Sequence, residues 1–136
     1  MKPELRDRFY GQTVEEWIEK LPGELPIDAV GLWQIVSFGR EGFGLSGEEL
    51  IAVVRQGIAA LLAKGAVPVV GAMDGIHVWT SVNYGETAAQ ISEAVITEWL
   101  NLGRDPEVGD VWFALPHILE ATLLANRVLR GKEDLS

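Results

Sequence analysis

The clearest pattern in this chain lies in residues 46–82, which predict a capped helix followed by a ribbon of two strands. Ser46 and Glu49 have the spacing of a capping box, in which each side chain satisfies a backbone N–H group at the start of a helix. Leucine, isoleucine and valine then recur every three or four residues, so one face of this helix is expected to pack against a core. Gly65 is expected to end the helix.

Two strands are predicted after this helix, over residues 66–71 and 76–82. Both runs are rich in β-branched residues. Between them stand Asp74 and Gly75, a pair that favours a tight turn because it tolerates positive φ angles. The stretch therefore predicts the order helix, strand, turn, strand.

Capping boxes also mark the start of two further helices. Thr13 with Glu16 predicts a short amphipathic helix that stops before the break at residues 21–23. Thr87 with Gln90 predicts another helix, which follows the ribbon. A central helix is expected as well, in the apolar stretch before residue 40.

The remaining elements have weaker boundaries. The central helix is predicted over residues 28–39, because little polar surface is left in this segment. Residues 109–115 alternate like a strand, and Pro116 suits the first turn of a last helix that runs to about Arg130. Together the elements predict an α+β fold of about five helices with a small, mainly antiparallel, three-stranded sheet.

One domain is expected over residues 1–136, with residues 1–12 and 131–136 as partly ordered ends. A chain of about 150 residues buries roughly 70% of its unfolded surface, which is enough for a core without disulfides. The chain contains no cysteine, which excludes thiol catalysis and cysteine-based zinc sites and fits an intracellular setting. We expect a cytoplasmic protein, because the mixed-charge N-terminus is unlike a secretory signal. No membrane association is expected, since no apolar run approaches the roughly 20 residues that span a bilayer.

The sequence carries no catalytic, cofactor or metal signature, and none of these sites is predicted. His77 and His117 are the only histidines, and neither has a second ligand at a recognisable zinc spacing. The glycines of residues 39–47 precede a helix, but they also follow one, whereas a dinucleotide-binding loop follows a strand. These glycines are therefore interpreted as a connection between helices.

The tryptophans give the only residue-level indication of a binding surface. Trp17, Trp33 and Trp99 fall on apolar helical faces and are assigned to the core. Alternation in the ribbon should direct Trp79 away from the face that carries Ile76, and both faces of the sheet then bear large apolar groups. Either the chain covers both faces, or one face is left for a partner. The candidate partner-binding residues are His77, Trp79, Tyr84 and Trp112.

The predicted order of two helices and a hairpin over residues 28–82 resembles the winged-helix class. In that class a second helix is followed by a β-hairpin wing. The passage LLAKGAV, residues 61–67, is similar to the transition from helix to strand in those proteins. The resemblance implies a helix–helix–hairpin segment, and with it a regulator that binds nucleic acid.

Charge favours a different kind of partner. The chain has 20 acidic and 11 basic residues, a net charge of −9 that repels the phosphate backbone of nucleic acids. No nucleic-acid partner is therefore expected, and a basic protein partner is favoured, with a homodimer as a further option. The alternative is that the acidity only maintains solubility.

The sequence as a whole favours a non-enzymatic protein–protein interaction module, of the kind found among small bacterial regulators, adaptors and immunity-type proteins. The first alternative is a winged-helix-type regulator that binds nucleic acid. The second is a small-molecule binder or enzyme whose site assembles from dispersed residues such as His77, Tyr84 and His117.

Overall fold

An antiparallel sheet of four strands lies at the centre of the computed structural model, which describes residues 4–123. β4 lies between β1 and β2, so that Val30 faces Phe113 on one side and Trp112 faces Val69 on the other. The sequence predicted the mixed α+β class, which is confirmed, but it predicted three strands. In spatial order the strands are β1 (Val30–Gly31), β4 (Trp112–Ala114), β2 (Val67–Gly71) and β3 (Trp79–Ser81).

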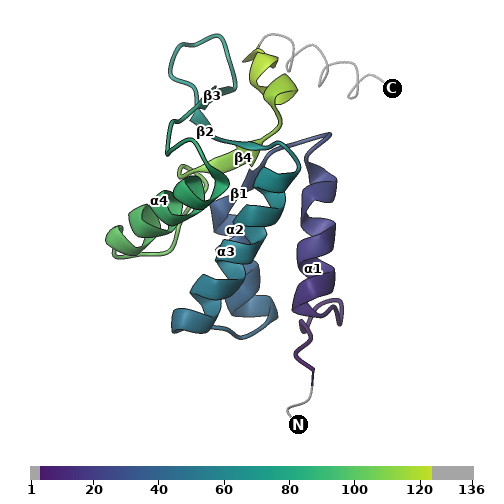
Figure 1. The fold of residues 1–136 in the computed structure, drawn as a ribbon. Coiled ribbons are helices and arrows are strands. Elements are labelled where there is room, and N and C mark those ends of the chain that lie inside the picture. Colours follow the sequence, from purple (N-terminus) through teal and green to yellow (C-terminus); the bar gives the residue numbers. More distant parts are fainter. Residues whose placement is uncertain (1–3, 124–136) are drawn as a thin grey trace.

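Helices cover one face of this sheet. Figure 1 shows α2, α3 and α4 on one side of the strands, with the short helical turn η3 on the other side. Four α-helices lie within the described residues, where the sequence predicted about five helices in all. They are α1 (Val14–Lys20), α2 (Leu32–Ser37), α3 (Gly47–Ala63) and α4 (Ala88–Asn101), and the shorter turns are η1 (Leu21–Glu24), η2 (Phe38–Gly42) and η3 (Pro116–Glu120).

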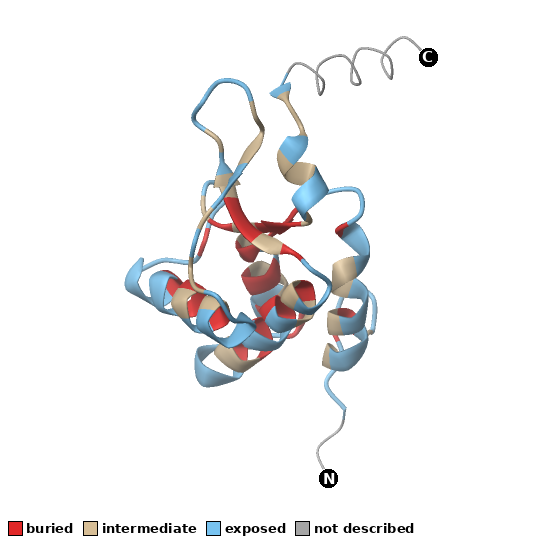
Figure 2. Ribbon diagram, turned by 45° about the horizontal axis from the view of Figure 1, so that its top comes forward, coloured by how far each residue is buried: buried red, intermediate tan, exposed pale blue. Residues whose placement is uncertain are grey.

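The main core lies between the sheet and these helices. Phe113 and Val30 of the sheet belong to the same buried cluster as Ile58 and Leu61 of α3 and Val95 of α4, and none of these side chains is more than 3% exposed. Figure 2 shows the buried residues gathered where the helices meet the strands. Burial of one such side chain stabilises a fold by roughly 1.5–3 kcal/mol, so this layer supplies most of the stability.

The central helix α2 begins at Leu32, and the prediction of a helix from residue 28 is wrong. Val30 and Gly31 are instead extended and pair with β4. The backbone N–H of Gly31 then donates to Oε1 of Gln34 at 2.9 Å, which closes the first turn of α2. Because the partner strand lies much later in the chain, no local pattern indicates β1.

The ribbon of β2 and β3 is present, but a longer loop over residues 72–78 replaces the predicted tight turn. Strand pairing stops where Gly71 faces Trp79. Oδ1 of Asp74 accepts the backbone N–H groups of Ile76 and His77, each at 2.8 Å, and these bonds hold the loop open beyond a two-residue turn. Ile76, which alternation placed toward the core, is consequently 58% exposed.

The last predicted helix is also interrupted. Pro116 opens η3, a short 3-10 turn that ends at Glu120, and Ala121 is extended. Thr122 then forms an antiparallel bridge with His77 of the 72–78 loop. The rest of the predicted helix, to about Arg130, and the tail over residues 131–136 lie outside the described residues.

The predicted order of two helices and a hairpin is present as α2, α3, β2 and β3. The sheet differs from a simple hairpin wing, because β4 is inserted between β1 and β2 and pairs with both. Within residues 4–123, no helix has the length and apolar character needed to cross a membrane.

Two of the three predicted capping boxes form. Thr13 with Glu16 and Thr87 with Gln90 exchange side-chain and backbone hydrogen bonds of 3.1 Å at the starts of α1 and α4. Ser46 stands before α3, but its hydroxyl makes no capping bond. Gly47 follows it with a left-handed φ of +57°, which turns the backbone out of the geometry that a capping box needs.

Alanine at the two kinds of cap should therefore have different effects. We expect Thr87→Ala to lower the free energy of unfolding by about 1 kcal/mol, because a real cap is lost. Ser46→Ala should change it by less than about 0.5 kcal/mol, as for an ordinary surface position. Urea denaturation of both variants checks this, and a loss above about 1 kcal/mol for Ser46→Ala would show that its hydroxyl caps α3 in solution.

Candidate functional site

The second face of the sheet carries Trp79 of β3 and Trp112 of β4, and Trp33 from the first turn of α2 contacts Trp112. We call these three residues the tryptophan cluster. The ring centroids of Trp79 and Trp112 are 5.2 Å apart, and those of Trp33 and Trp112 are 6.3 Å apart with the rings inclined at 68°. Such tilted and edge-to-face contacts are the favoured arrangements of aromatic pairs. Two of the four candidate binding residues, Trp79 and Trp112, are thus brought into contact.

The chain itself partly covers this face. Ala29, Val69 and Ala114 are buried beneath the cluster, at 5%, 0% and 0% exposure. Ile118 and Leu119 of η3 pack against the same group. All three tryptophans are partly exposed, so this face is a small second core that the chain does not cover completely.

Trp33 belongs to this cluster, although its helical spacing predicted a place in the main core. Its Nε1 is buried and has no hydrogen-bond partner among the described residues, whereas Nε1 of Trp112 donates to the carbonyl of Val108 at 2.8 Å. A Cβ atom on Gly31 would lie 2.8 Å from Nε1 of Trp33 and 3.1 Å from Cδ2 of Trp112. The two rings therefore meet above a backbone position that has room only for hydrogen.

His77 lies in the loop before β3, where its ring bonds to Asp74. Nδ1 of His77 is 2.7 Å from Oδ2 of Asp74. This bond, together with the backbone N–H groups of His77 and Ile76, lowers the pKa of Asp74 to about 2. The histidine side chain thus helps to fix the loop.

The carboxyl group of Asp74 should titrate well below an ordinary aspartate. Because its pKa is lowered in the folded state, its contribution to loop stability is complete above about pH 4 and is lost as the pH falls toward 2. NMR titration should show the amide resonances of Ile76 and His77 shifting with a midpoint near pH 2. This transition should be absent in Asp74→Asn, and a midpoint near 4 would contradict the bonded geometry.

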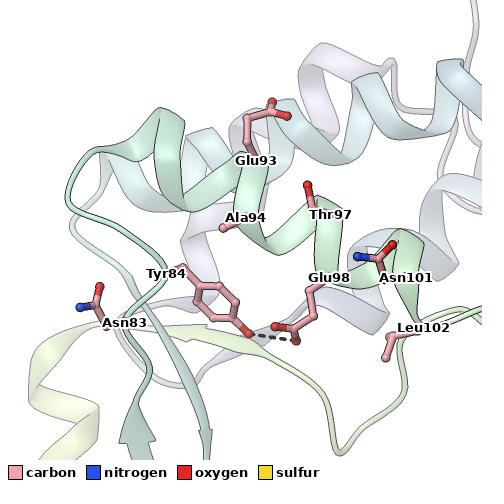
Figure 3. Close-up of a pocket in the computed structure, with 8 residues that line it drawn as sticks. All are labelled: Asn83, Tyr84, Glu93, Ala94, Thr97, Glu98, Asn101 and Leu102. Carbon is pink, nitrogen blue, oxygen red and sulfur yellow. Dashed lines mark hydrogen bonds between the residues drawn. The ribbon is translucent and has the colours of Figure 1, made fainter.

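Tyr84, the fourth candidate, lies in an open groove beside α4 with a volume of about 720 Å³. We call this the Tyr84 groove. Figure 3 shows the tyrosine ring reaching from the segment after β3 toward the C-terminal half of α4. The groove is lined by Asn83, Tyr84, Glu93, Ala94, Thr97, Glu98, Asn101 and Leu102.

Tyr84 and Glu98 are joined across this groove. The tyrosine hydroxyl donates to Oε1 of Glu98 at 3.1 Å (Figure 3). Burial raises the pKa of the Tyr84 hydroxyl, and the bond to the Glu98 carboxylate raises it further, so the hydroxyl remains a proton donor at neutral pH. A protonated phenol held by a carboxylate is suited to binding and not to proton abstraction.

The groove is acidic. Glu93 is paired with Arg55 of α3 at 2.6 Å, but Glu98 forms no ion pair with another described residue. Asp110 adds negative potential near the Tyr84 hydroxyl and raises its pKa. Among the residues that the structure describes, no lysine, arginine or histidine lines the groove.

The two histidines are not part of this groove. His117 is on η3, where its Nε2 is 3.2 Å from the carbonyl oxygen of Pro26, and His77 is in the 72–78 loop. Neither lines the space beside Tyr84. Over residues 4–123, no group of three or more histidine and acidic side chains has an arrangement that could hold a metal ion.

Sequence reasoning missed Trp33 and Glu98. The apolar spacing of α2 points to a buried Trp33 but not to which of two cores receives it. Glu98 is an ordinary acidic residue on the polar side of α4, and its contact with Tyr84 joins residues fourteen positions apart in the chain. No motif indicates such a pair before the fold is known.

Comparison of the chain with models of known protein families, with curated proteins and with solved structures found no match. The tryptophan cluster and the Tyr84 groove are interpreted from their own geometry and charge.

Proposed function

We propose that this protein is a non-enzymatic interaction module that binds a basic segment of a partner protein in the Tyr84 groove. The observation that carries the proposal is the charge of the groove: of its two glutamates only Glu93 is paired, with Arg55 of α3, and no basic side chain of residues 4–123 lines it. Glu98 is exposed and has no cation beside it among the described residues. A lysine or arginine of a partner would supply the missing charge.

The shape of the groove favours the same occupant. Long basic side chains pack their aliphatic part on apolar surface and extend their charged end to an acceptor. Here the ring of Tyr84 with Ala94 and Leu102 offers the apolar surface, and the carboxylate of Glu98 is the acceptor. Tyrosine is also frequent among the residues that contribute most to protein–protein binding.

The whole chain supports association with a basic partner. A net charge of −9 attracts a basic protein at long range and accelerates encounter, most strongly at low salt. We assign the contact to Tyr84 before Trp79 and Trp112, because these two rings already pack against the second core. Such a module suits a small regulator, adaptor or immunity-type protein that acts by occupying its partner.

Affinity capture from native cell lysate, followed by titration with the purified partner, tests this proposal. We expect a basic protein whose affinity falls about tenfold in Glu98→Gln, which keeps the acceptor for Tyr84 but removes the charge. Glu19→Gln, on an exposed position of α1 outside the groove, is the matched control and should change the affinity less than twofold. An acidic partner, or equal losses in both variants, would refute the proposal.

Duplex DNA provides a second test. In a low-salt mobility-shift titration we expect the protein to bind DNA no better than an inert acidic protein, because its charge repels phosphate. Salt-sensitive binding at submicromolar concentration would instead support the winged-helix-type regulator.

A further inference from the structure

A cleft beside α1 and α2 shares no lining residue with the Tyr84 groove. Its volume is about 490 Å³, and small-molecule sites typically measure roughly 300–1,000 Å³. Tyr10, Trp17 and Phe38 form an aromatic wall, in which the rings of Trp17 and Phe38 are stacked with centroids 5.0 Å apart. We call this the α1–α2 cleft.

Two carboxylates supply the charge of the α1–α2 cleft. Glu24 and Asp28 both line it, both are exposed, and neither forms an ion pair with a described residue. Oδ1 of Asp28 accepts the backbone N–H of Ala29 at 2.8 Å, which restrains this carboxylate. No lysine, arginine or histidine of residues 4–123 lines the cleft, so no described side chain within it neutralises its negative charge.

A narrower cavity of about 200 Å³ adjoins the cleft, and the two share the lining residues Tyr10, Trp17, Leu21, Glu24 and Phe38. Gln12 lines this cavity, and its Oε1 is buried without a hydrogen-bond partner among the described residues. Lys20 lines the narrow cavity and not the cleft, so a cation is better accommodated toward Asp28.

We propose that the α1–α2 cleft binds a small organic ammonium that carries an aromatic ring. The ring would stack against Tyr10 and Phe38, and the ammonium group would bind the carboxylates of Glu24 and Asp28. Aromatic faces also attract a neighbouring cation, so the aromatic wall and the two carboxylates both favour binding of the ammonium group. Tyr10 is 75% exposed in the free protein, and a bound ring covers this apolar surface.

Isothermal titration of the full chain with 2-phenylethylammonium chloride tests this site, with neutral 2-phenylethanol as the matched ligand. We expect the amine to bind at least tenfold more tightly than the alcohol. Glu24→Gln and Asp28→Asn should each lower the affinity for the amine threefold to tenfold. Glu19→Gln should leave this affinity within twofold of that of the unaltered protein. Tyr10→Ala, at a largely exposed position, should also weaken it and is a second test if a carboxylate variant fails to fold.

Four results would overturn the proposal. Equal affinities for the amine and the alcohol would show that the carboxylates do not contribute, and no saturable binding at millimolar amine would exclude the site. An equal loss of amine affinity in Glu19→Gln would show that the amine responds only to the overall charge of the protein. A short peptide that presents its ammonium group on a lysine side chain is the last comparison. If this peptide bound more tightly than the amine, the natural occupant of the cleft would be a protein segment and not a small molecule.

Discussion

Replacing Phe113 with alanine is expected to lower the free energy of unfolding by about 3–5 kcal/mol. Phe113 is fully buried, at 0% exposure, and is the largest such side chain among the described residues. It belongs to β4, which pairs with strands on both sides, and it packs in the core with residues of α3 and α4. Because β4 is held by both neighbours, the chain cannot collapse into the space that the ring leaves.

Urea denaturation of Phe113→Ala beside Val108→Ala checks this expectation. Val108 is 64% exposed and precedes the same strand, so its truncation should cost less than about 0.5 kcal/mol. If Phe113→Ala lowered the free energy of unfolding by less than about 1.5 kcal/mol, the sheet would not pack against the helices as described.

The parts of the fold that could be predicted are those set by neighbours in the chain. The caps of α1 and α4 are confirmed because Thr13 with Glu16, and Thr87 with Gln90, interact three positions apart. The buried face of α3 follows from a pattern of three or four residues, and Gly65, with a φ of +93°, ends that helix as expected. Each feature is decided within a few residues of itself.

The parts that could not be predicted depend on distant pairing. β1 forms only because Val30 meets Phe113, and it shortens the helix that the apolar pattern placed from residue 28. Asp74 was expected in a tight turn because its sequence suits one, but its bonds to residues 76 and 77 make a wider loop. In both places, contacts formed by the folded chain override the local conformational preference of the sequence.

The candidate sites show the same division. Alternation correctly separated Trp112 from Phe113 on β4, so the two faces of the sheet were anticipated. The pairing of Tyr84 with Glu98 and the aromatic wall of the α1–α2 cleft were not anticipated, because both join elements whose packing is a property of the whole fold.

Gly31→Ala is expected to cost about 2 kcal/mol and to separate Trp33 from Trp112. The new Cβ atom would lie 2.7 Å from Cδ1 of Trp33 and 3.1 Å from Cδ2 of Trp112, closer than ordinary contact distances. Both are large planar rings, and Trp112 is held in addition by Trp79 and by the bond from its Nε1 to the carbonyl of Val108, so it cannot yield as a flexible chain end would. Denaturation measures the loss, and a weakened near-ultraviolet circular dichroism signal reports the separated rings.

Gly71→Ala is the matched control for this prediction. Gly71 faces Trp79 on the same side of the sheet, but a Cβ atom there would meet nothing within 4 Å. Neither Gly31 nor Gly71 has a positive φ, so both backbones accept alanine, and the substitution restricts the unfolded chain equally in each case. Gly71→Ala should therefore keep the stability within about 0.5 kcal/mol of the unaltered protein and retain the aromatic signal. If both variants lost the same stability, the loss would come from the backbone of the strands. The contact between Trp33 and Trp112 would then not be the reason why position 31 requires glycine.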